Sequence, residues 1–387
     1  MDDKKTIAVL GATGSVGRQA LEVAEDLGAD VALLSAHSSV DAMEAAARRH
    51  HPHLCAMTDP LAARELSVRL ADTDIPVLSG EEGLCEAIAM TEADVFVNSI
   101  LGRAGLLPSL AVVDRGARLA LANKESMVVA GEIVRARAAA TGAELLPVDS
   151  EHSAIFQCLG AGKGAEVRRI FLTASGGPFR GYDRARLAGV TREHTLAHPT
   201  WQMGAKITVD SATLANKGFE VIEAVRLFDV APEQIEVVVH PESIIHSAVE
   251  YIDNTVIAEM SVPDMRSCVQ YAVTYPDRVP GLMKPLDLFA VGHLSFERPD
   301  PEAFPLLPLA FRAVKQGGAA PAILNAADEV AVAAFLRDEL DLLGIFDVVC
   351  ETVALTDATA SDLEGILAAD AEARRVAAQL AQKHKKG

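Results

Sequence analysis

Short apolar runs alternate with longer amphipathic stretches over the first 150 residues. Apolar runs of five to seven residues occur at 6–10, 30–35, 53–57, 94–100, 117–123 and 143–148. Ala-rich stretches with helical periodicity, such as 18–27 and 40–50, lie between them. Near-continuous apolar strands that alternate with helices predict an α/β fold with a parallel sheet covered on both faces.

The pattern changes after this region. Residues 150–275 contain longer strand-like runs separated by loops and predict an α+β domain. Residues 276–302 are rich in proline and glycine and predict a linker. Residues 303–387 show helical periodicity and predict a C-terminal helical bundle. Residues 1–149 then form a separate N-terminal domain.

Glycines follow the first predicted strand. Gly11, Gly14 and Gly17 lie between that strand and the next helix, spaced G-x-x-G-x-x-G. Glycine there permits a tight turn and lets backbone amides approach a pyrophosphate at the helix N-terminus. A glycine turn without a ligand is the alternative, but the strand–turn–helix context favours a Rossmann-like nucleotide site.

The end of the second strand bears on the choice of cofactor. NAD enzymes usually carry an acid there, whereas this chain has Ser35 to Ser39 with His37 among them. An acid would repel a 2′-phosphate; the hydroxyls, His37 and either Arg48 or Arg49 would accept one. The sequence therefore favours NADPH over NADH.

Charge and cysteine usage exclude several classes of protein. A net charge of −19 argues against a nucleic-acid or anionic-membrane partner. The five cysteines are scattered and form no C-x-x-C pair, so neither a disulfide framework nor a thiolate metal site is indicated. No apolar run is long enough to span a membrane, and the first residues do not resemble a signal peptide. We expect a cytoplasmic protein.

Two polar clusters end apolar strands. "PVDSEH" places Asp149 and Glu151 either side of Ser150. In an extended chain such residues share a face and could converge on one cation, although a solvated strand end is the plainer interpretation. "LANKES" places Asn123, Lys124 and Glu125 at another strand end, where an exposed turn and a ligand-binding edge are equally good interpretations.

Residues 209–228 predict one helix with two faces. Leu214 begins an apolar stripe, while Asn216, Lys217 and Glu220 share a polar face. A surface Lys–Glu pair is the commoner explanation. The alternative makes Glu220 a third carboxylate beside Asp149 and Glu151, a hard oxygen set that suits Mg²⁺ or Mn²⁺.

Further polar turns could complete a substrate pocket. Ser211, Asn216 and Lys217 offer the donors that a phosphate needs, and Ser175 precedes two glycines. The only tryptophan, Trp201, lies in an expected loop that could close over a ligand. His240 and His246 lie in strand-like segments and are interpreted as structural.

Seven motifs together resemble the 1-deoxy-D-xylulose 5-phosphate reductoisomerase family over nearly the whole chain. In order they are "GATGSVG", "LANKES", "LLPVDSEHSAIFQ", "TASGGPF", "HPTWQMG", "VDSATLANKGFE" and "LNAADEVAVAAFL". The resemblance implies a homodimer with an NADPH domain, a central catalytic and dimerisation domain and a helical C-terminal domain. It also implies a divalent metal (Mg²⁺, Mn²⁺ or Co²⁺) and inhibition by fosmidomycin.

The resemblance implies roles for individual residues. The metal ligands would be Asp149, Glu151 and Glu220, with Lys124 and His198 as the other catalytic residues. Substrate would be bound by Lys124, Ser150, Glu151, Ser175, His198, Trp201, Ser211, Asn216, Lys217 and Glu220. NADPH would be bound by Thr13, Gly14, Ser15, Val16, His37, Ser38, Ser39, Asn123, Glu125 and Gly204. The chain departs from many members at His37 and Ser39, where they have Gly and Asn, so 2′-phosphate recognition must differ in detail.

The implied reaction has two steps. A metal-assisted rearrangement of a linear ketose phosphate gives a branched aldehyde, by a retro-aldol/aldol or a ketol-shift route, and NADPH then reduces it to 2-C-methyl-D-erythritol 4-phosphate. A semialdehyde dehydrogenase is one rival, but it needs a cysteine nucleophile, and Cys158 lies in an apolar helical run. A non-catalytic NADP sensor is the other; it explains the glycines but not the carboxylates.

Overall fold

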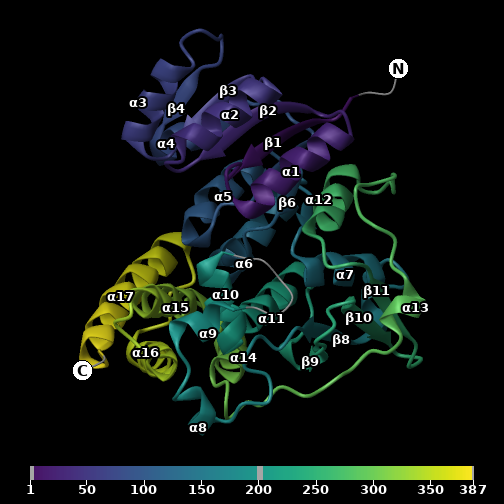
Figure 1. The fold of residues 1–387 in the computed structure, drawn as a ribbon, viewed down its shortest axis with the longest axis vertical. Coiled ribbons are helices and arrows are strands. Elements are labelled where there is room, and N and C mark those ends of the chain that lie inside the picture. The colour runs from purple at the N-terminus through teal and green to yellow at the C-terminus, as the bar shows by residue number, and fades with distance from the viewer. Residues whose placement is uncertain (1–3, 198–203, 386–387) are drawn as a thin grey trace. The chain divides into compact units, whose positions relative to one another are not determined.

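The computed structural model describes residues 4–197 and 204–385, which form two compact units (Figure 1). The first unit comprises residues up to 126, residues 134–153 and residues 264–284; the remaining residues form the second. Among the described residues, no helix combines the length and apolar character that crossing a bilayer requires.

The first unit contains a seven-stranded sheet in which every pair of neighbours is parallel. Its strands are β1 (Thr6–Leu10), β2 (Asp30–Ala36), β3 (Leu54–Met57), β4 (Val77–Ser79), β5 (Val95–Asn98), β6 (Leu119–Leu121) and β7 (Leu145–Pro147). Their order is β4-β3-β2-β1-β5-β6-β7, so the winding reverses between β1 and β5. Ligands of such sheets bind at the carboxyl edge beside that reversal.

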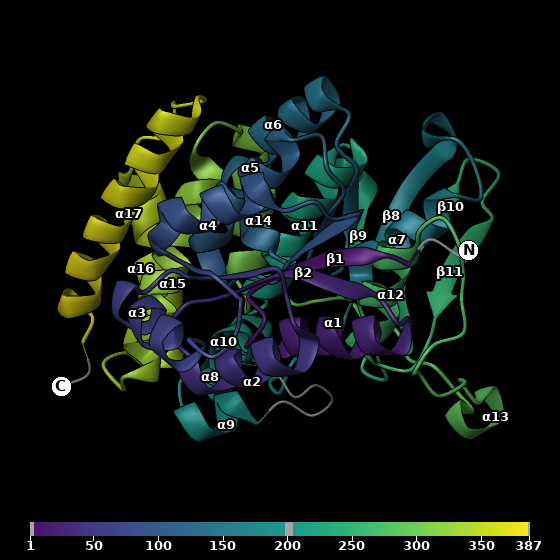
Figure 2. The same ribbon diagram turned by 90° about the horizontal axis from the view of Figure 1, so that it is seen from above.

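Helices cover this sheet as the sequence predicts. They are α1 (Ser15–Asp26), α2 (Val40–His50), α3 (Pro60–Arg69), α4 (Gly80–Met90), the 3₁₀ turn η1 (Gly102–Gly105), α5 (Leu106–Asp114), the first and last turns of α6 (Lys124–Thr141), and α12 (Met265–Thr274). Figure 2 shows α1 and α2 on one side of β1 and β2, with α4 and α5 on the other. Helix α12 packs on α1, far earlier in the sequence. The Rossmann-like prediction is confirmed.

The second unit contains a four-stranded mixed sheet with the order β11-β10-β8-β9. The strands are β8 (Val167–Ala174), β9 (Ile235–Val239), β10 (Ile245–Tyr251) and β11 (Val256–Met260). Strand β10 runs antiparallel to both neighbours, whereas β8 and β9 are parallel. The predicted α+β character of this region is confirmed, and β11 is left as an edge strand.

Helices make up the rest of the second unit. They are α7 (Ser150–Leu159, whose first residues belong to the first unit), η2 (Gly164–Glu166), α8 (Arg184–Leu187), α9 (Arg192–Leu196), α10 (Ala205–Thr213), α11 (Ala215–Phe228), η3 (Pro232–Gln234), α13 (Leu288–Val291), α14 (Leu306–Gln316), α15 (Ala320–Leu336), α16 (Leu342–Leu355) and α17 (Leu363–Lys383). Helix α15 packs against α14, α16 and α17, which confirms the C-terminal bundle.

Three local expectations differ from the structure. Strand β4 was not predicted, because it has three residues and none of them is buried. The single helix expected over 209–228 is wrong, since Leu214 adopts a left-handed conformation (φ 57°) and separates α10 from α11. Residues 276–302 include α13, and Glu297 pairs with the end of β9 at Val239.

Candidate active site

The glycine turn joins β1 to α1 in the first unit. Gly11 has φ 86°, and a side chain there would lie 2.9 Å from the backbone of Ser99. A side chain at Gly17 would lie 2.2 Å from the Gly11 carbonyl oxygen. Gly14 is the N-cap of α1 and offers no side-chain oxygen to the amides of the first turn. Those amides, which include Ser15 and Val16, can therefore donate hydrogen bonds to a phosphate group.

The end of β2 carries the residues expected at the ribose. His37, Ser38 and Ser39 are all exposed, and Nδ1 of His37 lies 2.8 Å from Oγ1 of Thr58. Asp41, the nearest acid in the sequence, lies in the first turn of α2 and pairs with Arg69 at 2.6 Å. Asp59, after β3, caps α3 by accepting from the amides of Leu61 and Ala62. No carboxylate of residues 35–39 opposes a 2′-phosphate, as the sequence indicates.

Neither arginine suggested for the 2′-phosphate is placed to bind it. Arg48 and Arg49 lie in the last turn of α2, about 13 Å along the axis from Ser39. Arg48 pairs with Glu44 and Asp72, and Arg49 pairs with Glu25. Both guanidinium groups are held by carboxylates at the far end of the helix.

Asn123 caps a helix and links two loops of the first unit. It is the N-cap of α6, accepting a hydrogen bond from the Ser126 amide. Its amide group donates to the carbonyl oxygens of Ile100 (2.6 Å) and Gly102 (2.8 Å). The buried Asn123 side chain thus joins the loops after β5 and β6 at the carboxyl edge of the sheet, next to the half-buried Glu125.

The carboxyl end of β7 brings four predicted residues together. The Lys124 ammonium lies 2.5 Å from Oδ2 of Asp149, and both side chains are almost fully buried. Ser150 begins α7 and donates to Glu151 at 2.5 Å. The extended geometry expected for this stretch is wrong, because Glu151 lies in the first helical turn. A side-chain interaction nevertheless links Glu151 with Asp149.

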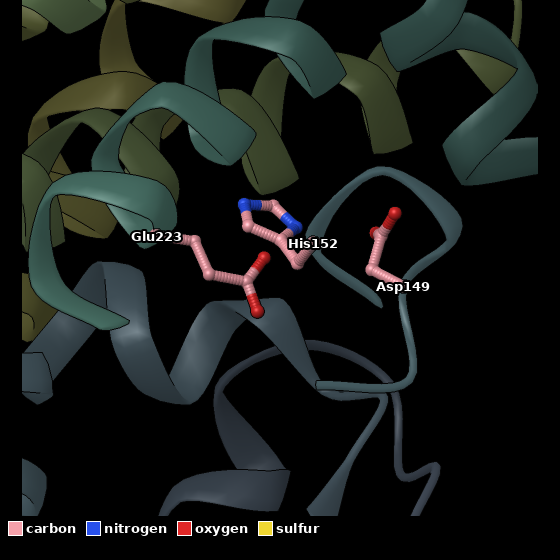
Figure 3. Close-up of side chains that lie close together, drawn as sticks. All are labelled: Asp149, His152 and Glu223. Atoms are coloured by element: carbon pink, nitrogen blue, oxygen red, sulfur yellow. The ribbon is translucent and has the colours of Figure 1, made fainter. Parts of the chain in front are cut away.

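His152 is a neighbour that the sequence reasoning passed over. Its side chain is fully buried in the first turn of α7, close to Asp149 (Figure 3). Burial acts to raise the pKa of Asp149, but the positive charges of Lys124 and His152 outweigh it, so the pKa lies far below its ordinary value. Asp149 is therefore an ionised carboxylate at neutral pH. Glu223, also labelled in Figure 3, is a fully buried acid of α11 in the second unit.

The polar face of α11 is buried in the second unit, which excludes the surface interpretation. Lys217 is 4% exposed and Glu220 is 1% exposed, and the two form an ion pair. Asn216 donates to the other oxygen of Glu220 at 2.5 Å. The Lys217 ammonium and the Asn216 side-chain amide thus both donate to one buried carboxylate, within about one turn of the helix.

The Ser175 turn meets the end of α10. Ser175 follows β8, and its hydroxyl accepts from the Gly177 amide at 3.3 Å. A side chain at Gly177 would lie 2.8 Å from the Ser211 carbonyl oxygen, so this turn packs directly on α10. The structure therefore brings Ser175 and Ser211 together. Of the other predicted residues, Gly204 is the N-cap of α10, whereas His198 and Trp201 lie outside the described residues.

His246 is a second residue whose chemistry the sequence did not reveal. It lies in β10, where burial, followed by the nearby charges of His240 and Lys217, lowers its pKa to about 4. Lys217 is thus one of the positive charges that keep the buried His246 imidazole neutral. The signal for both histidines was burial in the fold, which a single sequence does not display.

Chemically, the first unit supplies a dinucleotide cradle and an ionised carboxylate, and the second supplies a buried Lys–Asn–Glu cluster. A parallel sheet of this order with a glycine-rich first turn defines a dinucleotide-binding protein of the dehydrogenase type. Three family profiles then match the chain: "1-deoxy-D-xylulose 5-phosphate reductoisomerase" at residues 7–131, its C-terminal domain at 145–228, and "DXP reductoisomerase C-terminal domain" at 260–376. The chain belongs to the 1-deoxy-D-xylulose 5-phosphate reductoisomerase family.

Individual relatives agree along their whole lengths. The reductoisomerase of Symbiobacterium thermophilum is 50% identical over 381 residues, covering 97% of this chain and 98% of its own. That of Pseudomonas syringae pv. syringae is 47% identical over 394 residues, covering 99% and 100%.

Solved structures of such enzymes match the fold closely. The enzyme of Zymomonas mobilis in complex with NADPH has a TM-score of 0.92 at 42% identity, covering 98% of this chain and all of its own. A reductoisomerase in complex with NADPH, fosmidomycin and magnesium has a TM-score of 0.92 at 37% identity, with 98% of each chain covered.

Proposed function

We propose that this chain converts 1-deoxy-D-xylulose 5-phosphate to 2-C-methyl-D-erythritol 4-phosphate, a step of non-mevalonate isoprenoid precursor biosynthesis. It is an NADPH-dependent oxidoreductase that uses a divalent cation. The observation that carries the proposal is the buried cluster of Asn216, Lys217 and Glu220, which fits a phosphorylated substrate and a metal-assisted reaction. The chain that holds this cluster is 50% identical to a reductoisomerase. A sensor protein would have no use for such a cluster.

NADPH is assigned to the first unit. The amides of Thr13 to Val16 would hold the pyrophosphate, and His37, Ser38 and Ser39 would face the 2′-phosphate. Asn123 would act by fixing the loop at the edge of the sheet, beside Glu125, and Gly204 would approach the cofactor from α10. The absence of an acid at residues 35–39 supports NADPH over NADH.

A divalent cation is assigned to Asp149, Glu151 and Glu220. The chemistry of this donor set fits, because ionised carboxylates suit Mg²⁺, Mn²⁺ or Co²⁺, and Asp149 is held ionised by Lys124 and His152. Mg²⁺ accompanies a related reductoisomerase of 37% identity. When bound, the cation would supply Lewis-acid stabilisation of an oxyanion, and NADPH would supply the hydride.

The chain's own groups would bind and orient the substrate. Ser175, Ser211, Asn216 and Lys217 would hold the phosphate end, which lies remote from the reacting carbons and supplies binding energy. Lys124 and Ser150 would contact the carbon skeleton. His198 and Trp201 are proposed to contact the substrate from the segment before α10, with Trp201 excluding water.

We further propose a homodimer in the cytoplasm. The edge strand β11 and the adjoining turn expose apolar side chains, Ile252, Val256, Ile257 and Met260. An unpaired apolar edge strand is a natural surface for pairing with a second copy. Cysteines that form no disulfide among the described residues suit a reducing compartment. We propose that the functional parts follow residues 1–149, 150–275, 276–302 and 303–387.

One assay tests the proposed function. NADPH oxidation is followed after addition of 1-deoxy-D-xylulose 5-phosphate, with and without EDTA. We expect oxidation that EDTA abolishes and that Mg²⁺ or Mn²⁺ restores. Absence of oxidation with this substrate and with other sugar phosphates would refute the proposal and favour the sensor.

A further inference from the structure

Lys206 lies between two buried carboxylates of the second unit. Its ammonium lies 2.5 Å from Oδ2 of Asp210, four residues along α10, and 2.8 Å from Oδ2 of Asp328 on α15. The Asp210 and Asp328 side chains are 4% and 1% exposed. The ion pairs therefore join α10 to α15 of the C-terminal bundle.

Asp328 depends on this contact. Within the described residues, Lys206 is its one ion-pair partner, and Oδ1 of Asp328 accepts no hydrogen bond. A buried carboxylate is costly unless a cation compensates it, so removing Lys206 would leave that cost unopposed. The position of the Lys206 ammonium beside Asp328 of α15 is thus strongly constrained.

The bundle side of the contact is itself fixed. Asn325 donates to Glu329 at 3.1 Å, and Glu329 pairs with Arg374 of α17 at 2.7 Å. Arg374 also pairs with Asp370 at 2.8 Å. The "LNAADE" motif, which no predicted catalytic role uses, therefore builds a rigid polar layer that presents Asp328.

The other side of Lys206 leads to the phosphate residues. Asp210 directly precedes Ser211, whose carbonyl packs on the Ser175 turn. The Lys206 ammonium also lies 5.0 Å from the ring centroid of Phe219, which adjoins Glu220 on α11. One ammonium thus contacts both helices on which Ser211, Asn216 and Lys217 are mounted.

We propose that Lys206 is a positioning residue for the phosphate subsite, through which Asp328 of the C-terminal bundle fixes α10 and α11. The inference rests on the proposed function and gives the bundle, which carries none of the predicted catalytic residues, a part in substrate binding. A purely structural ion pair would affect the stability of the fold without weakening substrate binding more than NADPH binding. Measuring both KM values therefore distinguishes a positioning role of Lys206 from a structural one.

The test compares variants of the full chain in the NADPH oxidation assay. Lys206→Met keeps the length of the side chain and removes its charge. We expect the KM for 1-deoxy-D-xylulose 5-phosphate and the inhibition constant of inorganic phosphate each to rise about tenfold, with kcat and the KM for NADPH within about twofold. Lys206→Arg should restore part of the affinity. Asp328→Asn, which leaves the Asp210 pair intact, should give a smaller rise in the same two constants.

Lys315→Met is the matched control. Lys315 pairs with Glu233 at 2.6 Å, but both side chains are largely exposed, at 72% and 61%. This variant should match the wild type in all four constants. The inference fails if Lys206→Met leaves the substrate KM unchanged, or if it alters the NADPH and substrate constants equally. If Lys206→Met does not fold, Lys206→Arg and Asp328→Asn decide. Inactive wild-type protein would instead refute the proposed function.

Discussion

The Lys124 ammonium and the Asp149 carboxylate form a nearly buried ion pair, 2.5 Å apart, at the carboxyl edge of the seven-stranded sheet. Lys124 begins α6 and Asp149 follows β7, so the pair joins two neighbouring strand ends. It keeps Asp149 ionised, as the divalent cation proposed above would require.

The first prediction concerns Asp149. Asp149→Asn keeps the shape but removes the charge, so turnover should fall by about a hundredfold or more and the Mg²⁺ concentration needed for half activity should rise. NADPH binding, followed by fluorescence titration, should be unchanged. Asp26→Asn, at an exposed position of the same unit, should behave like the wild type. Near-normal turnover in Asp149→Asn would remove Asp149 from the metal site.

The second prediction concerns pH. Because the folded-state pKa of Asp149 is lowered, its ion pair stabilises the fold above the unfolded-state pKa of about 3.9, and this contribution is lost as the pH falls further. With EDTA present, the difference in unfolding free energy between wild type and Asp149→Asn should stay constant from about pH 8 to 5. It should shrink below about pH 4. Denaturant titrations measure it; a decline already between pH 7 and 5 would contradict the lowered pKa.

The third prediction concerns Lys217. Lys217→Ala removes the buried partner of Glu220, so the KM for the phosphorylated substrate should rise strongly while the KM for NADPH stays unchanged. Without metal, the free energy of unfolding should fall by about 3–5 kcal/mol, because the buried Glu220 carboxylate loses its ion-pair partner. Lys163→Ala, on the exposed loop before η2, is the control. An unchanged substrate KM would exclude Lys217 from the phosphate subsite.

The fourth prediction concerns cofactor choice. His37→Asp places an acid where NAD enzymes carry one, so the ratio of kcat/KM for NADPH to that for NADH should fall by at least about tenfold. Repulsion of the 2′-phosphate is the reason. His53→Asp adds the same charge at another exposed position of the unit and should leave the ratio unchanged. A ratio unaffected by His37→Asp would place the 2′-phosphate elsewhere.

The fifth prediction concerns β11. Ile257→Lys puts a charge on the proposed pairing edge, so sedimentation should show a shift from dimer to monomer. Leu61→Lys alters an apolar side chain that is 75% exposed on α3 and should not change the mass. A wild-type protein that sediments as a monomer would refute the dimer itself.

Much of the fold followed from the sequence because its signals are local. Helix α2 matches the predicted 40–50 stretch, and the glycine turn lies where the spacing placed it. Strand β4 was missed because three residues, none of them buried, carry no periodic signal. The break at Leu214 was not predicted, because leucine rarely adopts a positive φ and residues 209–217 contain no glycine or proline that would indicate a helix end.

The sequence predicted which residue types form the site better than it predicted how buried those residues are. The carboxylates and Lys217 stood out, yet a Lys–Glu pair three residues apart looks the same on a surface as in a core. Only tertiary packing makes the Lys217–Glu220 pair buried. His152 and His246 were missed for the same reason, since both are buried by tertiary packing and a lone histidine in a sequence gives no sign of it.

The left-handed residue at Leu214 has an electrostatic consequence. A continuous helix over 209–228 would have directed the amides of Asn216 and Lys217 at its own carbonyls. Ending α10 and restarting at Ala215 gives α11 a new positive pole, equivalent to about half an elementary charge. Two of the four side chains proposed to hold the phosphate, Asn216 and Lys217, are mounted on that pole, so the backbone adds attraction for an anion that no side chain supplies.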